Sequence, residues 1–179
     1  MERSTELGLT YLALSAYSGL TIAYRLTNAE CKARQTLAKG FALCESVGNR
    51  TARHQLEWSA GLLSHEGRDY AQAEDYLRTA WRGLIREGEI GYSAVVALDL
   101  ILLLVEQGRL AETIEVARAA LPGLEALRLR GESLVTVRML REAIKVNELN
   151  ISLLRSARDA ISEDRGGFQP RACNMTGKG

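Results

Sequence analysis

The residues of this chain that could do chemistry are few and widely spaced. His54 and His65 are 11 positions apart, which is three helical turns or about 16 Å, too far for one helix to offer both to a single metal ion. Paired carboxylates such as Glu74 and Asp75 are typical of a solvated helix surface. The sequence contains no Gly-rich phosphate loop, no HExxH and no GxSxG motif. We therefore expect no enzyme, no catalytic residue, no metal and no cofactor.

Asp99 is the one carboxylate in an unusual setting. It interrupts the densest apolar stretch of the chain, residues 94–105. A buried carboxylate without a partner is costly, so Asp99 must be paired, neutralised or exposed. We expect it to pair with an arginine or a helix-end amide. Two alternatives are an anchor for a basic group of a ligand and simple exposure to water.

Charge and composition indicate a cytoplasmic protein. The 23 basic and 22 acidic residues give a net charge of +1, so no global field would attract nucleic acid or an anionic membrane. The 12 residues of 94–105 are shorter than the roughly 20 that a transmembrane helix needs. Polar residues interrupt the N-terminal stretch 7–23, and Glu2 and Glu6 are untypical of a signal peptide. Cys31, Cys44 and Cys173 are expected to be free thiols, because an odd, scattered set forms no disulfide framework.

The sequence that contains these groups is repetitive. Small or apolar residues recur at intervals of 40 positions, as in Ala33, Ala73 and Thr113. Two further triplets follow on the same helical face: Leu37, Leu77, Ala117 and Gly40, Ala80, Ala120. Helical stripes at a fixed interval of this size predict stacked helix pairs. The expected fold is all-α, a right-handed α-solenoid of about four antiparallel helix pairs.

Glycines punctuate the expected pairs, since Gly48 and Gly88 are again 40 positions apart. Such glycines suit the left-handed turn that ends a helix. Pro122 should bend or shorten the helix that contains it. The repeat domain covers residues 1–162, and the polar, glycine-rich segment 163–179 is expected to be a disordered tail. The expected helices are 5–25, 28–47, 51–66, 70–87, 92–107, 110–127, 132–146 and 149–161.

Residues 28–161 resemble tetratricopeptide repeats, which have small residues where helices cross and an aromatic residue after the inner turn. The second pair carries the resemblance best, through Ala60, Gly61, Tyr70, Ala73, Leu77 and Ala80. The third pair fits through Ala97, Leu104, Gly108, Leu110, Thr113, Ala117 and Ala120. The interval of 40 exceeds the usual 34 and is similar to the longer repeats of bacterial regulators and signalling proteins. The resemblance implies a cytoplasmic bacterial scaffold that binds a protein or peptide.

The resemblance also implies that the first helix of each pair lines a concave groove, with an apolar floor and charged rims. Several of these residues could instead pack against the neighbouring repeat. For Trp58 the sequence favours neither role, so it is expected either to line the groove or to pack in the core. Trp81 is expected in the core or on the convex surface. The candidate partner-binding residues are Gln55, Trp58, Leu62, His65, Glu66, Leu98, Leu102, Glu106, Arg138 and Glu142.

Two other functions remain open. A solenoid end without a polar capping helix could self-associate, and Leu7, Leu9, Leu12 and Leu14 could form such a face. The chain could also be a regulatory module, in which a bound ligand shifts the superhelix and alters a transcription or signalling partner. A ligand-induced conformational change would distinguish this module from a passive scaffold.

Overall fold

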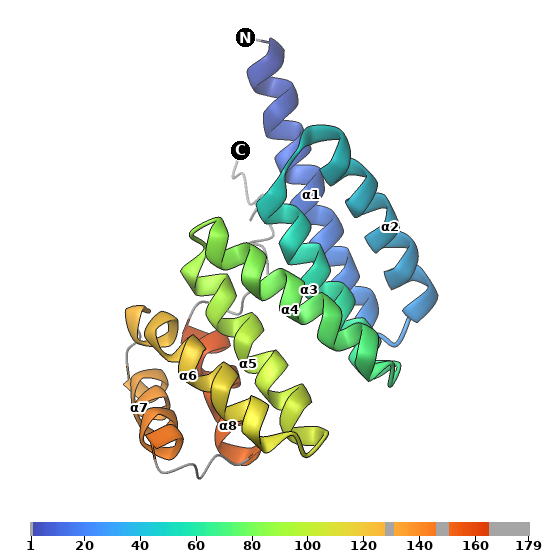
Figure 1. Ribbon diagram of the computed structural model, residues 1–179. Helices are drawn as coiled ribbons and strands as arrows, with labels where there is room; N and C mark the ends of the chain where they lie inside the picture. The colour runs from blue at the N-terminus through green and yellow to red at the C-terminus, as the bar shows by residue number, and fades with distance from the viewer. Residues whose placement is uncertain (1, 128–130, 146–150, 165–179) are drawn as a thin grey trace, which may run out of the picture.

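The chain folds as an array of helices that follow one another as antiparallel hairpins (Figure 1). A computed structural model describes residues 2–127, 131–145 and 151–164. No strand occurs among these residues. The helices are α1 Glu2–Leu26, α2 Glu30–Val47, α3 Arg50–Glu66, α4 Tyr70–Arg86, α5 Ile90–Glu106, α6 Leu110–Ala126, α7 Gly131–Lys145 and α8 Ile151–Asp164.

The all-α solenoid-like fold expected from the repeat is confirmed, with two local differences. Pro122 lies inside α6 and does not end it early, because the helix continues to Ala126. Helix α8 continues to Asp164, past the expected boundary at 162. The rest of the expected tail, including Cys173, lies outside the described residues.

The turns repeat every 20 residues, twice as often as the sequence stripe. A residue with positive φ follows each helix from α1 to α5; these residues are Asn28, Gly48, Arg68, Gly88 and Gly108. In each turn the next backbone N–H reaches five residues back, as from Asp69 to the Ser64 carbonyl at 2.9 Å. This bond satisfies a carbonyl that the helix end would leave without a partner. The turn spacing therefore gives the helices between these turns, α2 to α5, nearly equal lengths of 17 or 18 residues.

Arg68 occupies one of these left-handed positions, with φ of 62°, although the conformation favours glycine. We expect Arg68→Gly to raise the free energy of unfolding by about 0.5–1 kcal/mol. For a chain of this size each kcal/mol raises Tm by about 2–4 °C. The reciprocal change Gly108→Arg places a side chain at φ of 71° and should lower Tm by a similar amount. Calorimetry of both variants checks the pair, and equal signs would contradict this explanation.

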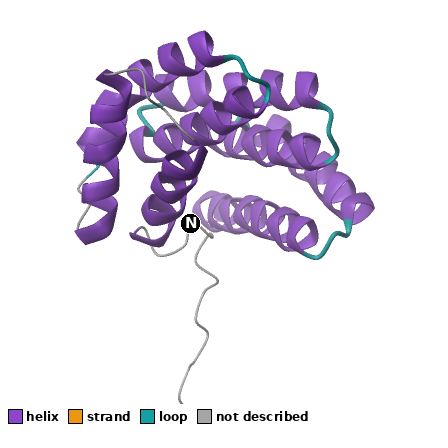
Figure 2. Cartoon of the chain, turned by 90° about the horizontal axis from the view of Figure 1, so that it is seen from below, coloured by secondary structure: helices purple, strands orange, loops and turns teal. Residues whose placement is uncertain are grey.

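The helices form two layers along an arc (Figure 2). Helices α1, α3, α5 and α8 pack side by side in that order, and we call them the inner layer. Helices α2, α4, α6 and α7 form the outer layer. Helix α4 packs against α3 and α5, and its backbone comes close to neither α2 nor α6. Since the inner neighbours α1, α3 and α5 touch whereas the outer neighbours α2, α4 and α6 do not, this part of the array curves with the inner layer on its concave side.

The small-residue stripe lies where the helices cross, as the sequence predicts. Ala33, Ala73 and Thr113 are each fully buried. The main core surrounds α5, whose residues from Ser93 to Ile101 are all buried. A smaller core joins α1, α2 and α3 around Leu56 and Leu63. Burial on nearly every side explains why α5 is apolar around its whole circumference.

Candidate binding surface

The inner face of α3 and α5 is held together by polar contacts between residues 41 positions apart. Arg25 of α1 donates to Glu66 of α3 at 2.5 Å. Trp58 Nε1 donates to Asp99 Oδ2 at 2.8 Å. The spacing recurs because successive inner helices run parallel, so that each residue meets the one a single repeat and one position later. These contacts fix the stagger between neighbouring repeats.

His65 continues this pattern toward the last inner helix. His65 Nε2 lies 2.7 Å from Glu106 Oε2, and Glu106 Oε1 accepts from Arg155 of α8 at 3.2 Å. The side chains of His65 and Glu106 are each about 30% exposed (30% and 29%). A charged partner could therefore reach this chain of contacts from solvent.

Asp99 pairs with an arginine, as the sequence predicts. Arg158 Nε donates to Asp99 Oδ1 at 2.8 Å, and the other carboxylate oxygen accepts from Trp58. The negative charge of Asp99 raises the pKa of the Arg158 guanidinium. The Asp99 side chain is only 6% exposed, with both oxygens bonded. It is therefore a structural ion pair, and the alternatives of a ligand anchor and of an exposed carboxylate are wrong.

The fourth pair departs from the expected arrangement. Arg155 and Arg158 of α8 meet Glu106 and Asp99 of α5, so α8 runs antiparallel to α5. In a regular array α7 would occupy this place, parallel to α5. Instead α7 packs against α6 and α8. The second helix of the last pair thus completes the inner layer.

This arrangement corrects three of the candidate residues. Arg138 and Glu142 lie on α7, which makes no packing contact with α3 or α5 among the described residues. Both are exposed, and Glu142 accepts from its neighbour Arg141 at 3.2 Å. Leu98 is fully buried in the core around α5, so it cannot line an open groove.

The other candidates do come together on the inner layer. Gln55, Trp58 and Leu62 of α3 and Leu102 of α5 are half-buried. They lie along the two helices on the N-terminal side of the ionic contacts made by Glu66, His65 and Glu106. Trp58 and Leu102 also pack against the core, so each combines a structural and an exposed part. This set, without Leu98, Arg138 and Glu142, is the candidate inner binding surface.

A second ionic cluster ties α4 to α6 on the outer layer. Arg109 donates to Glu74 and, at 2.5 Å, to Glu112. Arg78 bonds the same two acids, at 2.7 Å and 3.2 Å. The hydrogen bond from Arg109 is the largest cause that lowers the pKa of Glu74 from its ordinary value of 4.5. The pKa of Glu112 is lowered for the same reason.

Because the pKa of Glu74 is lowered in the folded state, the free energy of unfolding depends on pH in the acid range. The carboxylate is favoured in the folded state, so its contribution is present above the ordinary pKa of 4.5 and is lost as pH falls through the folded value. We expect Glu74→Gln to flatten the fall in unfolding free energy between about pH 5 and pH 3. Urea unfolding across this range checks it, with Asp75→Asn as the control at an exposed neighbour. A Glu74→Gln curve parallel to the wild-type one would contradict the assignment.

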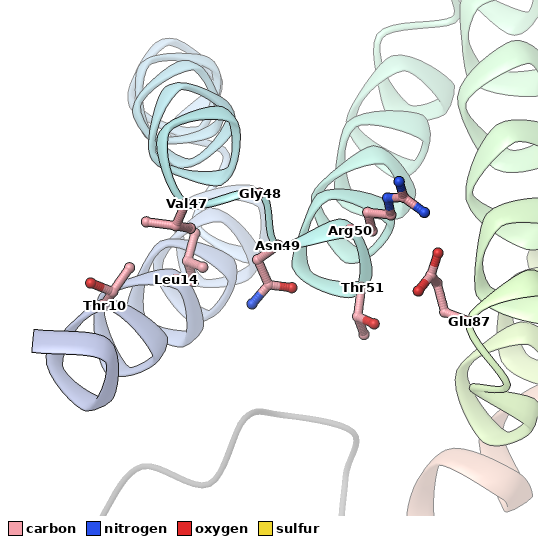
Figure 3. A pocket seen from close by; sticks show the side chains of 8 residues that line it. All are labelled: Thr10, Leu14, Val47, Gly48, Asn49, Arg50, Thr51 and Glu87. Carbon is pink, nitrogen blue, oxygen red and sulfur yellow. The ribbon is translucent and has the colours of Figure 1, made fainter. Parts of the chain in front are cut away.

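A hollow of about 270 Å³ lies beside the turn between α2 and α3. Figure 3 shows Arg50 and Glu87 approaching it from α3 and the end of α4, with Thr10 and Leu14 of α1 on the far side. Its remaining lining comes from the turn itself, around Gly48 and Asn49. Asn49 is committed to the fold, since its side chain accepts from the Ala52 N–H at 2.9 Å. The hollow presents one acid, one base and two threonine side chains, Thr10 and Thr51.

Another hollow, of about 250 Å³, lies between α4 and α6 on the outer layer. We call it the outer groove. Its lining is almost wholly apolar or small: Trp81, Ile85, Ile90, Ser93, Ala94, Ala119, Ala120, Pro122, Gly123 and Ala126. Sequence reasoning anticipated only Trp81 on this side. A comparison of the same position in successive repeats carries part of the signal for the groove, and the contact between His54 and Gly83, which only the structure shows, carries the rest.

No known protein family, curated protein or solved structure matches this chain. The helical-repeat architecture therefore rests on the structure. Among the described residues, no helix is long and apolar enough to cross a bilayer. Within the same ranges, no group of three or more His, Cys, Asp or Glu side chains is placed to hold a metal ion.

Proposed function

We propose that this chain is a non-catalytic scaffold of the tetratricopeptide-repeat kind, which binds a protein or peptide segment along the inner surface of α3 and α5. The observation that carries the proposal is the row of half-buried side chains Gln55, Trp58, Leu62 and Leu102. They lie on parallel helices whose stagger is fixed by cross-helix bonds. A preorganised surface of this kind binds without the entropic cost of ordering its own side chains.

The flanking ion pairs supply orientation. The Glu66 side chain is 46% exposed while bonded to Arg25, and Arg155 is 59% exposed while bonded to Glu106. Exposed pairs of this kind contribute little to stability. A charged group of the partner can therefore replace one member at small cost and set the direction in which the segment lies.

The proposal is tested by selecting peptides from a random display library on the wild-type protein. Counter-selection uses a variant with Gln55→Arg and Leu62→Arg, which places two charges on the inner surface without touching the core. We expect a set of related peptides whose Kd rises at least tenfold in this variant, about 1.4 kcal/mol. Ile85→Glu, on the outer layer, is the matched control and should leave Kd unchanged. Selected peptides that are indifferent to the inner substitutions would refute the inner surface as the binding site.

The described thiols are consistent with a bacterial cytoplasm, which we propose as the location. Cys31 is exposed and Cys44 is buried, and both are free. Burial raises the pKa of the Cys44 thiol, which keeps it protonated and inert. Fractionation with an antibody to the chain tests the location directly.

Self-association is the second candidate function, and α1 favours it. This helix ends the inner layer, with no neighbour beyond it in the described array. Leu12 and Leu20 are 63% and 45% exposed, and the exposed residues Ala16 and Ala23 continue the same stripe. The expected face is corrected here, since Leu14 is buried. The side chains of Leu7 and Leu9 lie outside the described residues.

Light scattering coupled to size exclusion tests the α1 stripe. We expect a dimer that dissociates when Leu12→Glu and Leu20→Glu are combined, because two carboxylates on the stripe would be buried without partners. Leu110→Glu is the control, at a leucine 57% exposed on α6. A wild-type protein that is monomeric at all accessible concentrations would exclude self-association.

A further inference from the structure

We propose that the outer groove is a second docking site, which takes a short amphipathic helix of a partner protein. The partner helix would present two neighbouring large apolar side chains to the groove and carboxylates to its α4 rim. This site is distinct from the inner surface, since α4 and α6 belong to the outer layer. The proposal stands whether or not the inner surface binds a peptide.

The groove exists because α4 and α6 both pack against α5 and meet each other only through long side chains such as Arg78 and Glu112. Its walls are Trp81 and Ile85 on one side and Ala119 and Gly123 on the other, above the first turns of α5. Small residues on α6 leave the space open. A Cβ added at Gly123 would meet nothing closer than Ile90 Cγ2, at 3.8 Å. A cavity of about 150 Å³ holds a benzene ring, so about 250 Å³ can hold one or two large side chains.

The preceding repeat fills the same place with its own side chains. Gly83 of α4 is the counterpart of Gly123, 40 positions earlier. There, an added Cβ would fall 2.3 Å from His54 Cε1, because the imidazole lies directly over the glycine. His54 is held by Glu57, with Nδ1 2.7 Å from Oε2. In the groove the counterpart of His54 is Ala94, which is too small to cover Gly123.

The other counterparts differ in the same sense. Glu45 is an exposed acid that pairs with Arg53 at 3.8 Å, whereas its counterpart Ile85 is 53% exposed. Arg50 is likewise exposed, and its counterpart Ile90 is 49% exposed. One repeat thus seals the gap between outer helices with polar groups. The next repeat opens the gap and lines it with exposed isoleucines, which is the pattern of a docking surface and not of the fold's own packing.

The α4 rim of the groove is basic. Arg78 points toward α6, where it reaches Glu112 at 3.2 Å. Arg82 and Arg86 continue this row one and two turns further along α4, and both are exposed. Neither makes an ion pair with an acid in the part of the chain that the structure describes. An apolar partner helix with carboxylates beside its anchor residues therefore complements the groove in both shape and charge.

A helix fits this groove better than an extended strand. The lining of α6 runs from Ala119 to Ala126, about two helical turns or 10 Å. The groove offers side chains and helix surfaces but no open sheet edge that an extended peptide could join. A helix laid between two others buries residues at i and i+3 or i+4. The partner segment is therefore short, with one pair of large apolar anchors.

The test uses a synthetic helical peptide of three turns as the probe, with leucines at i and i+4 and glutamates beside them. A second peptide replaces the glutamates with lysines, and a third scrambles the leucines. Binding is followed by NMR of the labelled full chain. We expect saturable shifts confined to α4, α6 and the first turns of α5, with the glutamate peptide at least tenfold tighter than the lysine peptide.

The groove variant exchanges each exposed isoleucine for its counterpart in the preceding repeat, Ile85→Glu and Ile90→Arg. Because both are surface residues, Tm should stay unchanged while the affinity for the glutamate peptide falls at least tenfold. Leu110→Glu is the matched control, since it introduces the residue that α2 carries at the equivalent Glu30. The inner-surface variant Gln55→Arg with Leu62→Arg should bind this peptide as the wild type does.

Four results would overturn the proposal. They are the absence of saturable shifts, shifts that fall on the inner surface, equal binding by the Ile85→Glu and Ile90→Arg variant, and equal binding of the lysine peptide. If sedimentation instead shows that the wild type dimerises and that this variant is monomeric, the occupant is a second copy of the chain.

Discussion

Replacing Asp99 with alanine is expected to lower the free energy of unfolding by about 3 kcal/mol. The substitution leaves the Trp58 indole N–H and the Arg158 guanidinium without their acceptor. Removing one member of a buried ion pair costs about 3–5 kcal/mol. We take the lower end of that range because the Arg158 side chain is 29% exposed and can partly turn to water. Equilibrium unfolding in urea measures the loss.

A double-mutant cycle with Arg158→Ala separates the pair from its surroundings. If the two groups act on one another, the double variant should be more stable than the sum of the single losses predicts. Trp58→Phe is the matched control, since it removes the donor to the other carboxylate oxygen but keeps the ring and the ion pair. Additive losses from Asp99→Ala and Arg158→Ala would contradict a direct pair.

The same variant should loosen α8. This helix packs against α5 through Leu154, Ala157 and Ile161 of the main core and through the Asp99–Arg158 and Glu106–Arg155 contacts, of which only the first involves a buried carboxylate. Hydrogen exchange in Asp99→Ala should therefore accelerate in α8 more than in α3 or α4. Uniform acceleration would mean that α8 unfolds only with the whole array. The Asp99–Arg158 pair thus contributes, together with the apolar core, to holding α8 against α5.

The sequence predicts that Asp99 pairs with an arginine or a helix-end amide, but it does not identify the partner. The cost of a buried charge follows from residue type and local context, so one aspartate within an apolar stretch is enough to predict a partner. The partner lies 59 positions away, on a helix that the repeat places elsewhere. Periodicity determines which face of a helix is buried, not the order in which the last two helices join the array.

Leu98 shows a second limit of the same kind. The repeat pattern predicts a groove residue at this position, because it gives the first helix of each pair one open face. Helix α5 is the central helix of the inner layer, packed against α3, α4, α6 and α8. Its stretch from Ser93 to Ile101 is buried throughout, so the apolar stripe has no boundary from which an exposed face could be deduced.

The sequence pattern does not predict the outer groove, for a different reason. Each of its residues is unremarkable alone, because isoleucine, alanine and glycine occur on many helix surfaces. Only the contrast between His54 and Ala94, or between Glu45 and Ile85, shows that one repeat is filled and the next is open. That contrast needs both the 40-residue register and the knowledge that Gly83 lies beneath His54, and the second is three-dimensional.

Gly61→Leu is expected to destabilise the protein by about 3 kcal/mol or more. Gly61 lies in α3 where it crosses α4, and a Cβ there would be 2.9 Å from Leu77 Cγ and 3.2 Å from the Ala73 carbonyl oxygen. Leu77 is 1% exposed, so it has no free space to move into. The carbonyl belongs to the backbone of α4, and relief of that contact requires the two helices to separate.

Gly61→Ala is the smaller change, for use if the leucine variant does not fold. Alanine gains about 1 kcal/mol over glycine in a helix interior, which offsets part of an overpacking cost of about 1–3 kcal/mol. We therefore expect a net loss of about 1 kcal/mol, which should shrink in a Leu77→Ala background, where only the contact with the Ala73 carbonyl oxygen remains. Gly123→Ala is the control, because its nearest neighbour is 3.8 Å away, and it should stabilise the protein by about 0.5–1 kcal/mol.

Opposite signs at two mid-helix glycines would show that close helix approach, and not helix propensity, requires glycine at position 61. Equal signs would mean that α3 and α4 can separate at little cost, and that the crossing does not set the curvature of the array.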